Sequence, residues 1–386
     1  MNNISQAARS RNGILFIMIL GSALLYVLYQ LFVDFSLGGN SWKQGDWLIN
    51  EISGPIRRGL LGSAILLFSD VVGLSPLLIL ISMQALFVTL IFTVVGVAAL
   101  RLGIPDKLLL LLISPGFLIL FWFNDPQGSV RKELLVYLAF LPLVVAALRN
   151  RGIPIAYVLS CIAYAMAVFA HEGTVFFLPF LWLAIFLVLP PNSSTQIRIA
   201  AMAVPSILAI VAGLYAAMNT HLPDTNQICA EVMQRGLDPA ICDGAIDYLE
   251  HTPEEARMEP GRLLSAHFPS FVLIYAACLL SFRVVLQGSD RVGLWFIAVV
   301  SSGLAFLPLY VLAGDWGRWL NYHISSLTFV LLIFLLKRRP AWLYDAPQQM
   351  GYVCLLAVSL VVGVNHSPGE MIGGFLVNVA LLIYNF

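Results

Sequence analysis

The sequence LLILISMQALFVTLIFTVVGVAAL, residues 77–100, runs for 24 residues without a charged side chain. A helix needs about 20 apolar residues to cross the core of a bilayer, so this stretch predicts a transmembrane helix. The whole 386-residue chain has the same character, because 60% of its residues are hydrophobic and only 11% are charged. Soluble domains are about 25% charged, so this composition excludes a water-soluble fold. The formal net charge of zero argues against a nucleic-acid-binding protein.

Eleven further apolar runs flank this stretch. Together they predict an all-α fold, a polytopic transmembrane helical bundle of about 10–12 spans, in a single membrane domain that covers residues 1–386. The run 60–74 is shorter and contains Asp70 and Gly73, so we expect an interfacial or re-entrant helix there, within a first outer loop at 34–76. The predicted spans are 13–33, 77–100, 107–123, 133–148, 153–170, 174–190, 199–218, 269–287, 292–313, 320–336, 350–364 and 371–386.

The distribution of charge predicts the orientation of the chain. Arg9 and Arg11 precede the first span, which is long enough for a signal anchor and has no A-x-A cleavage site after it. With a cytoplasmic N-terminus, the short loops carry twelve basic residues inside and six outside, in agreement with the positive-inside rule. Eighteen of the 21 acidic residues and all six histidines then lie outside or at the outer interface. We therefore expect any chemistry at the outer face.

Two of the five cysteines lie in the long outer loop 219–268, where short amphipathic helices are expected at 226–235 and 240–251. Cys229 and Cys242 are thirteen residues apart. An oxidising compartment would allow them to form a disulfide that closes this loop. The alternative is a pair of free thiols.

Two adjacent arginines, Arg57 and Arg58, lie in the first outer loop, although the positive-inside rule places most basic residues in cytoplasmic loops. Asp46 and Glu51 come shortly before them, and Asp34 stands at the end of the first span. Guanidinium groups bind phosphate oxygens through paired hydrogen bonds, so this loop is a candidate anion site. The alternative is that the arginines anchor an interfacial helix to lipid headgroups.

Two further groups of acids and bases stand at the outer ends of predicted spans. The turn NDPQGSVRKE places Asp125 on one side and Arg131, Lys132 and Glu133 on the other. A hydrated hairpin with compensating charges is the alternative there. His171 and Glu172 occupy a tight turn between two apolar runs. Ionisable groups near membrane depth usually face a bundle interior or a water-filled cavity, and the alternative is a polar cap on the turn.

The segment GDWGRWLNYH, residues 314–323, forms a fourth group. If it is helical, Asp315 and Arg318 are three residues apart and share a face with Tyr322, one turn further on. An ion pair with a purely structural role is the alternative. His323 begins a predicted span, where a lone histidine is more often a hydrogen-bonded core residue than a ligand.

Acids and bases therefore gather at helix ends in four outer loops, which suggests one cavity that opens outward at the membrane surface. A sugar donor linked to a polyprenyl phosphate would suit such a cavity. Cations would hold the departing phosphate, and a carboxylate or histidine would accept the proton of the acceptor hydroxyl. No glycine-rich phosphate loop and no metal-ligand spacing occurs in the sequence, although its carboxylates are numerous enough for a divalent metal.

The layout of the chain resembles that of the polytopic glycosyltransferases of the GT-C superfamily, which use polyprenyl-phosphate sugars and carry a catalytic acid in a first outer loop with interfacial helices. This resemblance implies that Asp34 or Asp46 is the acid and that 60–74 is an interfacial helix. The two acids are twelve residues apart, whereas many GT-C enzymes have paired acids in that loop. The layout is also similar to that of O-antigen-type polysaccharide polymerases and ligases, which rely on outer-face arginines and a histidine.

Both resemblances imply a membrane glycosyltransferase or polysaccharide polymerase at the outer face of a bacterial inner membrane, active in cell-surface glycan synthesis. Its partners would be a polyprenyl-linked sugar, a glycan acceptor and membrane lipid. The alternatives are a proton-coupled transporter or lipid-linked sugar flippase, and a non-catalytic membrane scaffold. The catalytic candidates are Asp34, Asp46, Glu51, His171 and Glu172, and the phosphate- or substrate-binding candidates are Arg57, Arg58, Asp125, Arg131, Lys132, Asp315, Arg318, Tyr322 and His323.

Overall fold

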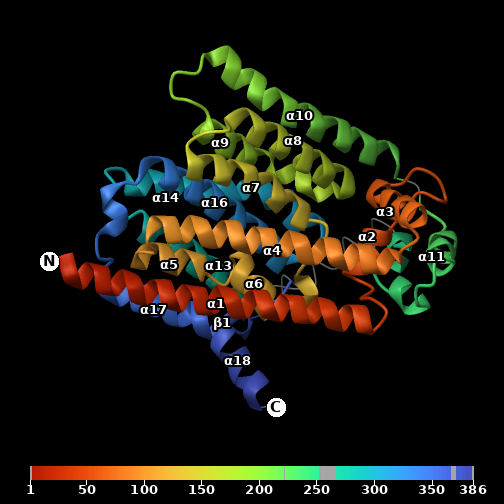
Figure 1. Cartoon of the computed structure of the whole chain (residues 1–386), viewed down its shortest axis with the longest axis horizontal. Coiled ribbons are helices and arrows are strands. Elements are labelled where there is room, and N and C mark those ends of the chain that lie inside the picture. Colours follow the sequence, from red (N-terminus) through yellow and green to blue (C-terminus); the bar gives the residue numbers. More distant parts are fainter. Residues whose placement is uncertain (1, 221, 252–254, 256–266, 367–370, 385–386) are drawn as a thin grey trace.

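A computed structural model describes residues 2–220, 222–251, 255, 267–366 and 371–384. Long helices run along a common direction through most of this part of the chain (Figure 1). Seven of them are long and apolar enough to cross a membrane, so the chain is an integral membrane protein. They are α1 (Asn2–Ser36), α4 (Pro76–Leu102), α8 (Ile153–Ala170), α10 (Thr195–Met218), α13 (Phe268–Val285), the run Val292–Leu312 that contains α14 (Val292–Ser302) and α15 (Leu307–Leu312), and α16 (Trp316–Arg338).

Several of the twelve predicted spans form shorter elements. Five apolar helices in the described residues have only 10 to 17 residues. A straight transmembrane helix needs about 20. The predicted spans 350–364 and 371–386 are shortened by an antiparallel hairpin of β1 (Val362–Val364) and β2 (Met371–Gly373). The five helices are α3 (Gly59–Val72), α7 (Leu134–Arg149), the run Glu172–Val188 that ends in α9 (Leu178–Val188), α17 (Gln349–Val361) and α18 (Phe375–Tyr384).

A proline divides the predicted span 107–123 into two helices. Pro115 has no backbone N–H, and the chain is not helical around it. Side chains of α16 bind the backbone groups that the break releases. The Asn321 amide donates to the carbonyl of Gly116 at 3.0 Å, and the Ser325 hydroxyl accepts from the first N–H of the second helix at 3.0 Å. The two helices are α5 (Asp106–Leu112) and α6 (Leu118–Asn124).

Helix α16 lies in the interior of the bundle and packs against α4, α7, α9 and α13. In its most apolar stretch 83% of the residues are buried by protein, compared with 11% in the run Val292–Leu312. Phe329 of α16 stacks on Phe140 of α7 with ring centroids 5.3 Å apart. The polar residues in the first turns of α16 are therefore held inside the protein.

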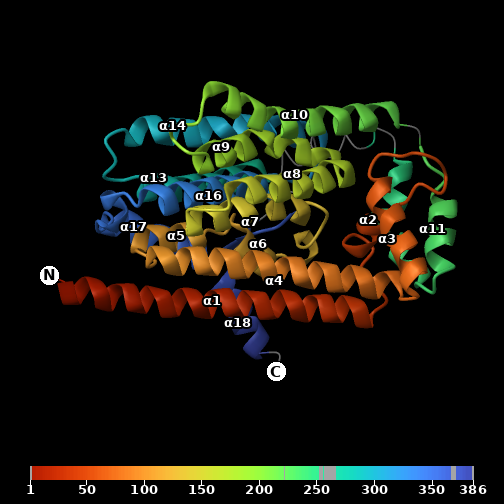
Figure 2. The ribbon, with the colours of Figure 1, turned by 45° about the horizontal axis from the view of Figure 1, so that its top comes forward.

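Short elements from two loops cover one end of the bundle, the right-hand end in Figures 1 and 2. A helix, α3, is present where the sequence predicts one at 60–74. It packs closely on the preceding loop, since a Cβ atom at Gly62 would lie 1.9 Å from the carbonyl oxygen of Ile49. A helix is also present near 226–235, but the segment 240–251 forms two 3-10 turns. The elements are α2 (Gln44–Leu48), α11 (Thr225–Met233), η3 (Pro239–Cys242) and η4 (Asp247–Glu250).

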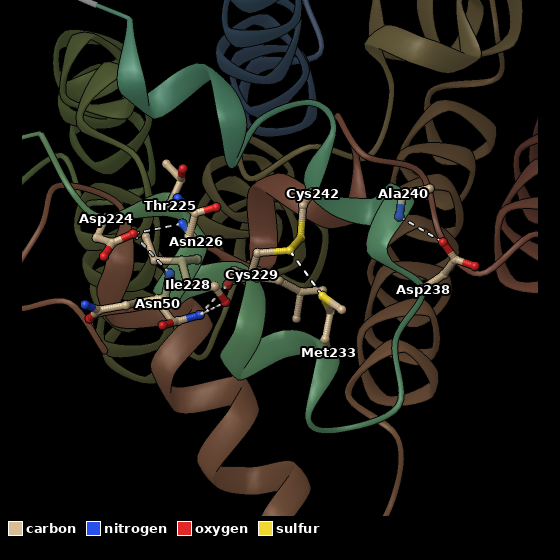
Figure 3. Close-up of a disulfide and its surroundings, with 12 residues drawn as sticks. Asn50, Asp224, Thr225, Asn226, Ile228, Cys229, Met233, Asp238, Ala240 and Cys242 are labelled. Atoms are coloured by element: carbon tan, nitrogen blue, oxygen red, sulfur yellow. Dashed lines mark hydrogen bonds between the residues drawn. A yellow bond between two sulfur atoms is a disulfide. The ribbon is translucent and has the colours of Figure 1, made fainter.

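The structure joins Cys229 and Cys242 in the disulfide that the sequence predicts, with their Cα atoms 5.9 Å apart (Figure 3). The bond connects α11 to η3. Asp224 caps α11 by accepting hydrogen bonds from the backbone N–H groups of Asn226 and Gln227. Asp238 caps η3 by accepting one from the backbone N–H of Ala240. Each half of the loop thus has its own local support as well as the covalent link.

We expect the double variant Cys229→Ser/Cys242→Ser to be less stable than the native chain by about 3 kcal/mol, because a disulfide around a loop of this length restricts the unfolded chain by that amount. The measurement is thermal unfolding of the purified protein in detergent. Cys354→Ser is the matched control, since Cys354 is an exposed free thiol. Equal unfolding temperatures for the double variant and this control would contradict the expectation.

Candidate functional site

Charged side chains from all four loops meet at the end of the bundle that α2 and α3 cover. We call this set the charge cluster. Direct contacts join these side chains into two groups of four, one around Lys132 and Arg58 and the other around Glu133 and Arg318. The charges of the first group act electrostatically on His171 and Arg318 of the second. The charge cluster consists of Asp46, Arg58, Lys132, Glu133, His171, Glu172, Asp315 and Arg318.

Helix α2 holds Asp46 in place through its neighbour Trp47. The indole N–H of Trp47 donates to the carbonyl of Val130 at 3.2 Å, and the amide of Gln84 donates to the same carbonyl at 2.9 Å. Val130 has a positive φ of 50°, an unusual conformation for a β-branched residue. These contacts fasten α2 to the turn before α7, so that Asp46 faces Lys132.

Asp46 and Lys132 form a buried pair with the carboxylate oxygen 3.7 Å from the ammonium nitrogen. Burial lowers the pKa of Lys132 to about 8, because the nearby charge of Asp46 only partly offsets the loss of water. Burial alone would raise the pKa of Asp46, but nearby positive charge, chiefly that of Lys132, leaves it lowered. Asp46 is therefore ionised at neutral pH, and Lys132 gains or loses its proton near neutrality.

Arg58 and Glu172 form a two-pronged ion pair. The Nε and Nη2 atoms of Arg58 lie 2.9 and 2.6 Å from the carboxylate oxygens of Glu172. Burial opposes the charge on Arg58, but Glu172 outweighs it and raises the pKa of the guanidinium. The backbone carbonyl of Arg58 accepts a hydrogen bond from Lys132 at 2.9 Å. Arg57 stays at the edge, with its side chain half exposed and 3.9 Å from the same carboxylate.

His171 is a neutral hydrogen-bond donor in this arrangement. Burial, reinforced by the charge of Arg58, lowers the pKa of His171 to about 4. The Nδ1 atom accepts a hydrogen bond from the backbone N–H of Gly173 at 3.0 Å, so the proton of the neutral ring is on Nε2. That nitrogen lies 3.9 Å from Glu133, beyond hydrogen-bond range. Its N–H group can therefore be offered to a substrate oxygen.

Arg318 links the first turn of α16 to the turn before α7. It pairs with Glu133 and with Asp315, and its Nη2 atom donates to the hydroxyl of Tyr322 at 3.3 Å. The predicted shared face of Asp315, Arg318 and Tyr322 is thus present. The Nε–H of Arg318 is buried, and within the described residues it has no hydrogen-bond partner. The indole N–H of Trp319, on the next residue, is in the same situation. Two neighbouring residues of α16 thus each keep a buried donor that no described residue satisfies.

Four of the predicted candidates have other partners outside the charge cluster. Asp34 forms a 2.6 Å ion pair with Lys43, and Glu51 bonds to Tyr215 of α10. Asp125 binds the imidazole of His366 at 2.7 Å. His323 lies deeper in α16 and bonds to Tyr275 and to Ser302, the latter at 2.8 Å.

Arg131 lies beside the charge cluster. Its Nε donates to the backbone carbonyl of Gln127 at 3.3 Å, and its guanidinium lies 5.8 Å from the ring centre of Trp42. Since Arg131 also affects the charge state of Asp46, it contributes positive potential to the cluster.

Sequence reasoning missed Glu133 as a site residue, although it directly follows the Arg131–Lys132 pair. The usable signal was the high density of ionisable residues in that turn. The pairing of Asp125 with His366 joins residues 241 positions apart, so no local sequence pattern could predict it.

Among the described residues, no three His, Cys, Asp or Glu side chains come close enough to hold a metal ion. The arrangement can instead bind an anion through its arginines and Lys132, and it can accept a proton at Asp46. No protein-family model, no curated protein and no solved structure matches this chain.

Proposed function

We propose that the protein is a membrane glycosyltransferase or polysaccharide polymerase that uses a polyprenyl-linked sugar donor. The observation that carries the proposal is the buried charge cluster at one end of an apolar bundle, where the Nε–H of Arg318 has no partner among the described residues. A polyprenyl phosphate combines the same two features, because its phosphate lies at headgroup level and its chain lies in the bilayer. Both ends of such a donor would find a matching environment in this protein.

The cations of the charge cluster would stabilise the departing phosphate. Two unit charges about 4 Å apart interact by about 4 kcal/mol at an effective dielectric constant of 20. Arg58, Lys132 and Arg318 are already ordered by their carboxylate partners, so little reorganisation is needed when negative charge develops. The Nε2–H of His171 would donate to a phosphate oxygen.

Asp46 is the proposed general base. Its carboxylate is ionised and is separated by 3.7 Å from Lys132, so it remains able to accept a proton. The acceptor hydroxyl oxygen would form a bond to the anomeric carbon while the bond from that carbon to the phosphate oxygen breaks. The bonding electron pair would leave with the phosphate, and the hydroxyl proton would move to Asp46. Asp34 is less suited, since its carboxylate is engaged by Lys43 at 2.6 Å.

We infer that the charge cluster faces the cell exterior from a bacterial inner membrane, with the N-terminus in the cytoplasm. Two features support this orientation. The disulfide lies at the same end as the cluster, and disulfides persist in oxidising compartments. The basic residues at the far end of α16, Lys337, Arg338 and Arg339, agree with the positive-inside rule.

A transporter or lipid-linked sugar flippase is the second candidate, and the broken pair α5 and α6 is the observation in its favour. Interrupted helices hold the substrate sites of many transporters near the middle of the membrane. Here the polar side chains of α16 bind the backbone groups next to the break, and the charge cluster lies at the end of the bundle. We therefore favour transfer chemistry over transport.

Activity is expected to fall as pH rises through about 8. Lys132 is cationic below its lowered pKa and neutral above it, so phosphate binding weakens on the alkaline side. Lys132→Arg should keep its charge at higher pH and move this alkaline limb upward. The measurement is the pH dependence of transfer rate for both proteins, with Lys43→Arg as the control. An unchanged alkaline limb in Lys132→Arg would contradict this assignment.

The function is tested by mass spectrometry of lipid-linked sugars and surface glycans in the native host, with and without the gene. Loss of a transferase or polymerase should cause a lipid-linked precursor to accumulate on the outer face and should shorten the glycan. A flippase defect would trap the precursor on the inner face. Unchanged glycan with no trapped precursor would contradict the proposal.

A further inference from the structure

A second charged region lies at the opposite end of the bundle from the charge cluster, the left-hand end in Figure 1. It is a cavity of about 760 Å³ between the C-terminal ends of α4, α7, α9 and α16 and the beginning of α10. We call it the basic pocket. Its size falls within the range of typical small-molecule sites, about 300–1,000 Å³.

Of the residues that the structure describes, six cationic side chains and no acidic one line the basic pocket. Two have polar partners that carry no full charge, since Lys337 donates to the amide oxygen of Asn150 and Arg198 donates to the carbonyl of Pro191. The Nε–H of Arg198 is buried and lacks a hydrogen-bond partner within the described residues. The six cations are Arg101, Arg149, Arg198, Lys337, Arg338 and Arg339.

The helix ends around the basic pocket do not account for this charge. Each helix C-terminus carries about half a negative charge from its unsatisfied carbonyl groups. Four such ends amount to about two negative charges, against six cations. A surplus of positive charge remains inside a concave surface, where it favours an anion with several oxygens.

The walls of the basic pocket are also apolar. Phe186, Leu189 and Leu336 line it together with the cations, and Phe186 is packed beneath the guanidinium of Arg198 at 4.8 Å from its ring centre. All these residues stand at the ends of apolar helices, the level at which lipid headgroups lie. A soluble anion would make no use of the apolar walls, whereas a phospholipid would occupy both kinds of surface.

We propose that the basic pocket binds the phosphate headgroup of an anionic membrane lipid. Basic pockets between transmembrane helices are a known way of recognising such headgroups. The arginines bind the phosphate oxygens, and the apolar walls contact the glycerol and the first carbons of the acyl chains. This site is independent of the glycosyl-transfer chemistry proposed for the other end.

The test is the binding of fluorescent phosphatidylglycerol to the full-length protein in nanodiscs of phosphatidylcholine. The variant is Arg149→Gln/Arg338→Gln, which removes two exposed cations that line the basic pocket. The matched control is Arg11→Gln/Arg291→Gln, which removes two exposed cations that do not line the pocket. Arg11 belongs to the first part of α1 and Arg291 directly precedes α14, and both helices begin at the same end of the bundle as the pocket (Figure 1). Non-specific attraction to anionic lipid falls equally in both variants. If the pocket binds the headgroup, the affinity for fluorescent phosphatidylglycerol should be about tenfold lower in the pocket variant than in the control.

Inorganic pyrophosphate separates a lipid from a soluble phosphate as the ligand. We expect it to displace the fluorescent lipid only at concentrations far above those of competing unlabelled phosphatidylglycerol. Equal lipid binding by the two double variants would overturn the proposal. Displacement by pyrophosphate as readily as by the lipid would also overturn it, because the pocket would then recognise free phosphate.

Discussion

Asp46→Asn is expected to lower the rate of glycosyl transfer by about 10²- to 10⁴-fold, the usual contribution of a general base. Asparagine keeps the shape of the side chain but cannot accept the proton of the acceptor hydroxyl. The variant loses the buried pair with Lys132 and hence some stability, but it should still accumulate in the membrane, because α2 remains fastened through Trp47. The measurement is the transfer rate with purified protein at matched concentration.

Two matched substitutions serve as controls for Asp46→Asn. Asp70→Asn makes the same chemical change in an exposed ion pair with Arg235, and it should leave the rate unchanged. Asp34→Asn tests the rival acid, and we expect a loss of stability from the broken pair with Lys43, with a much smaller loss of rate. A normal rate in Asp46→Asn, or an equal loss in Asp34→Asn, would refute the assignment.

Arg318→Lys is expected to reduce transfer by about 10²- to 10³-fold, comparable to removal of one preorganised donor to a developing charge. Lysine keeps the positive charge between Glu133 and Asp315, but it lacks the planar fork and the buried Nε–H of arginine. The effect should fall on the catalytic rate constant, with the unfolding temperature close to that of the native chain.

Arg318→Ala is the harsher variant. It leaves two carboxylates without their cation, and breaking a buried ion pair in this way destabilises a protein by about 3–5 kcal/mol. The control is Arg235→Lys, since Arg235 forms ion pairs with Asp70 and Glu231 at the surface. Full activity in Arg318→Lys would show that the geometry of the guanidinium has no catalytic importance.

The sequence was sufficient to predict the parts of the fold that follow from local composition. Long uncharged runs such as 77–100 become long helices, and the short run 60–74 becomes α3. The break at Pro115 was harder to predict, because the adjacent backbone groups are satisfied by α16, some 200 positions further along the chain. The β1–β2 hairpin likewise depends on a strand pairing that no run of hydrophobicity reveals.

The contacts of the candidate site also divide into those that local sequence predicts and those that depend on distant parts of the chain. Asp315, Arg318 and Tyr322 are neighbours along one helix face, so their contacts could be predicted from spacing alone. The ion pairs of Asp34 with Lys43 and of Asp46 with Lys132, on which our proposal of Asp46 as the base depends, could not be predicted in this way. The second pair depends on the packing of α2 against the turn before α7, through Trp47 and Val130.

Consumption of the donor lipid can be measured with purified protein in proteoliposomes that contain the lipid extract of the gene-deleted host. Mass spectrometry would follow the polyprenyl-linked sugars over time. We expect these lipids to decline and sugar-free polyprenyl phosphates to appear with the native chain and with Asp70→Asn, but not with Asp46→Asn. Polyprenyl-linked sugars that stay intact with the folded native chain, in the presence of host glycan acceptor, would contradict the proposed function.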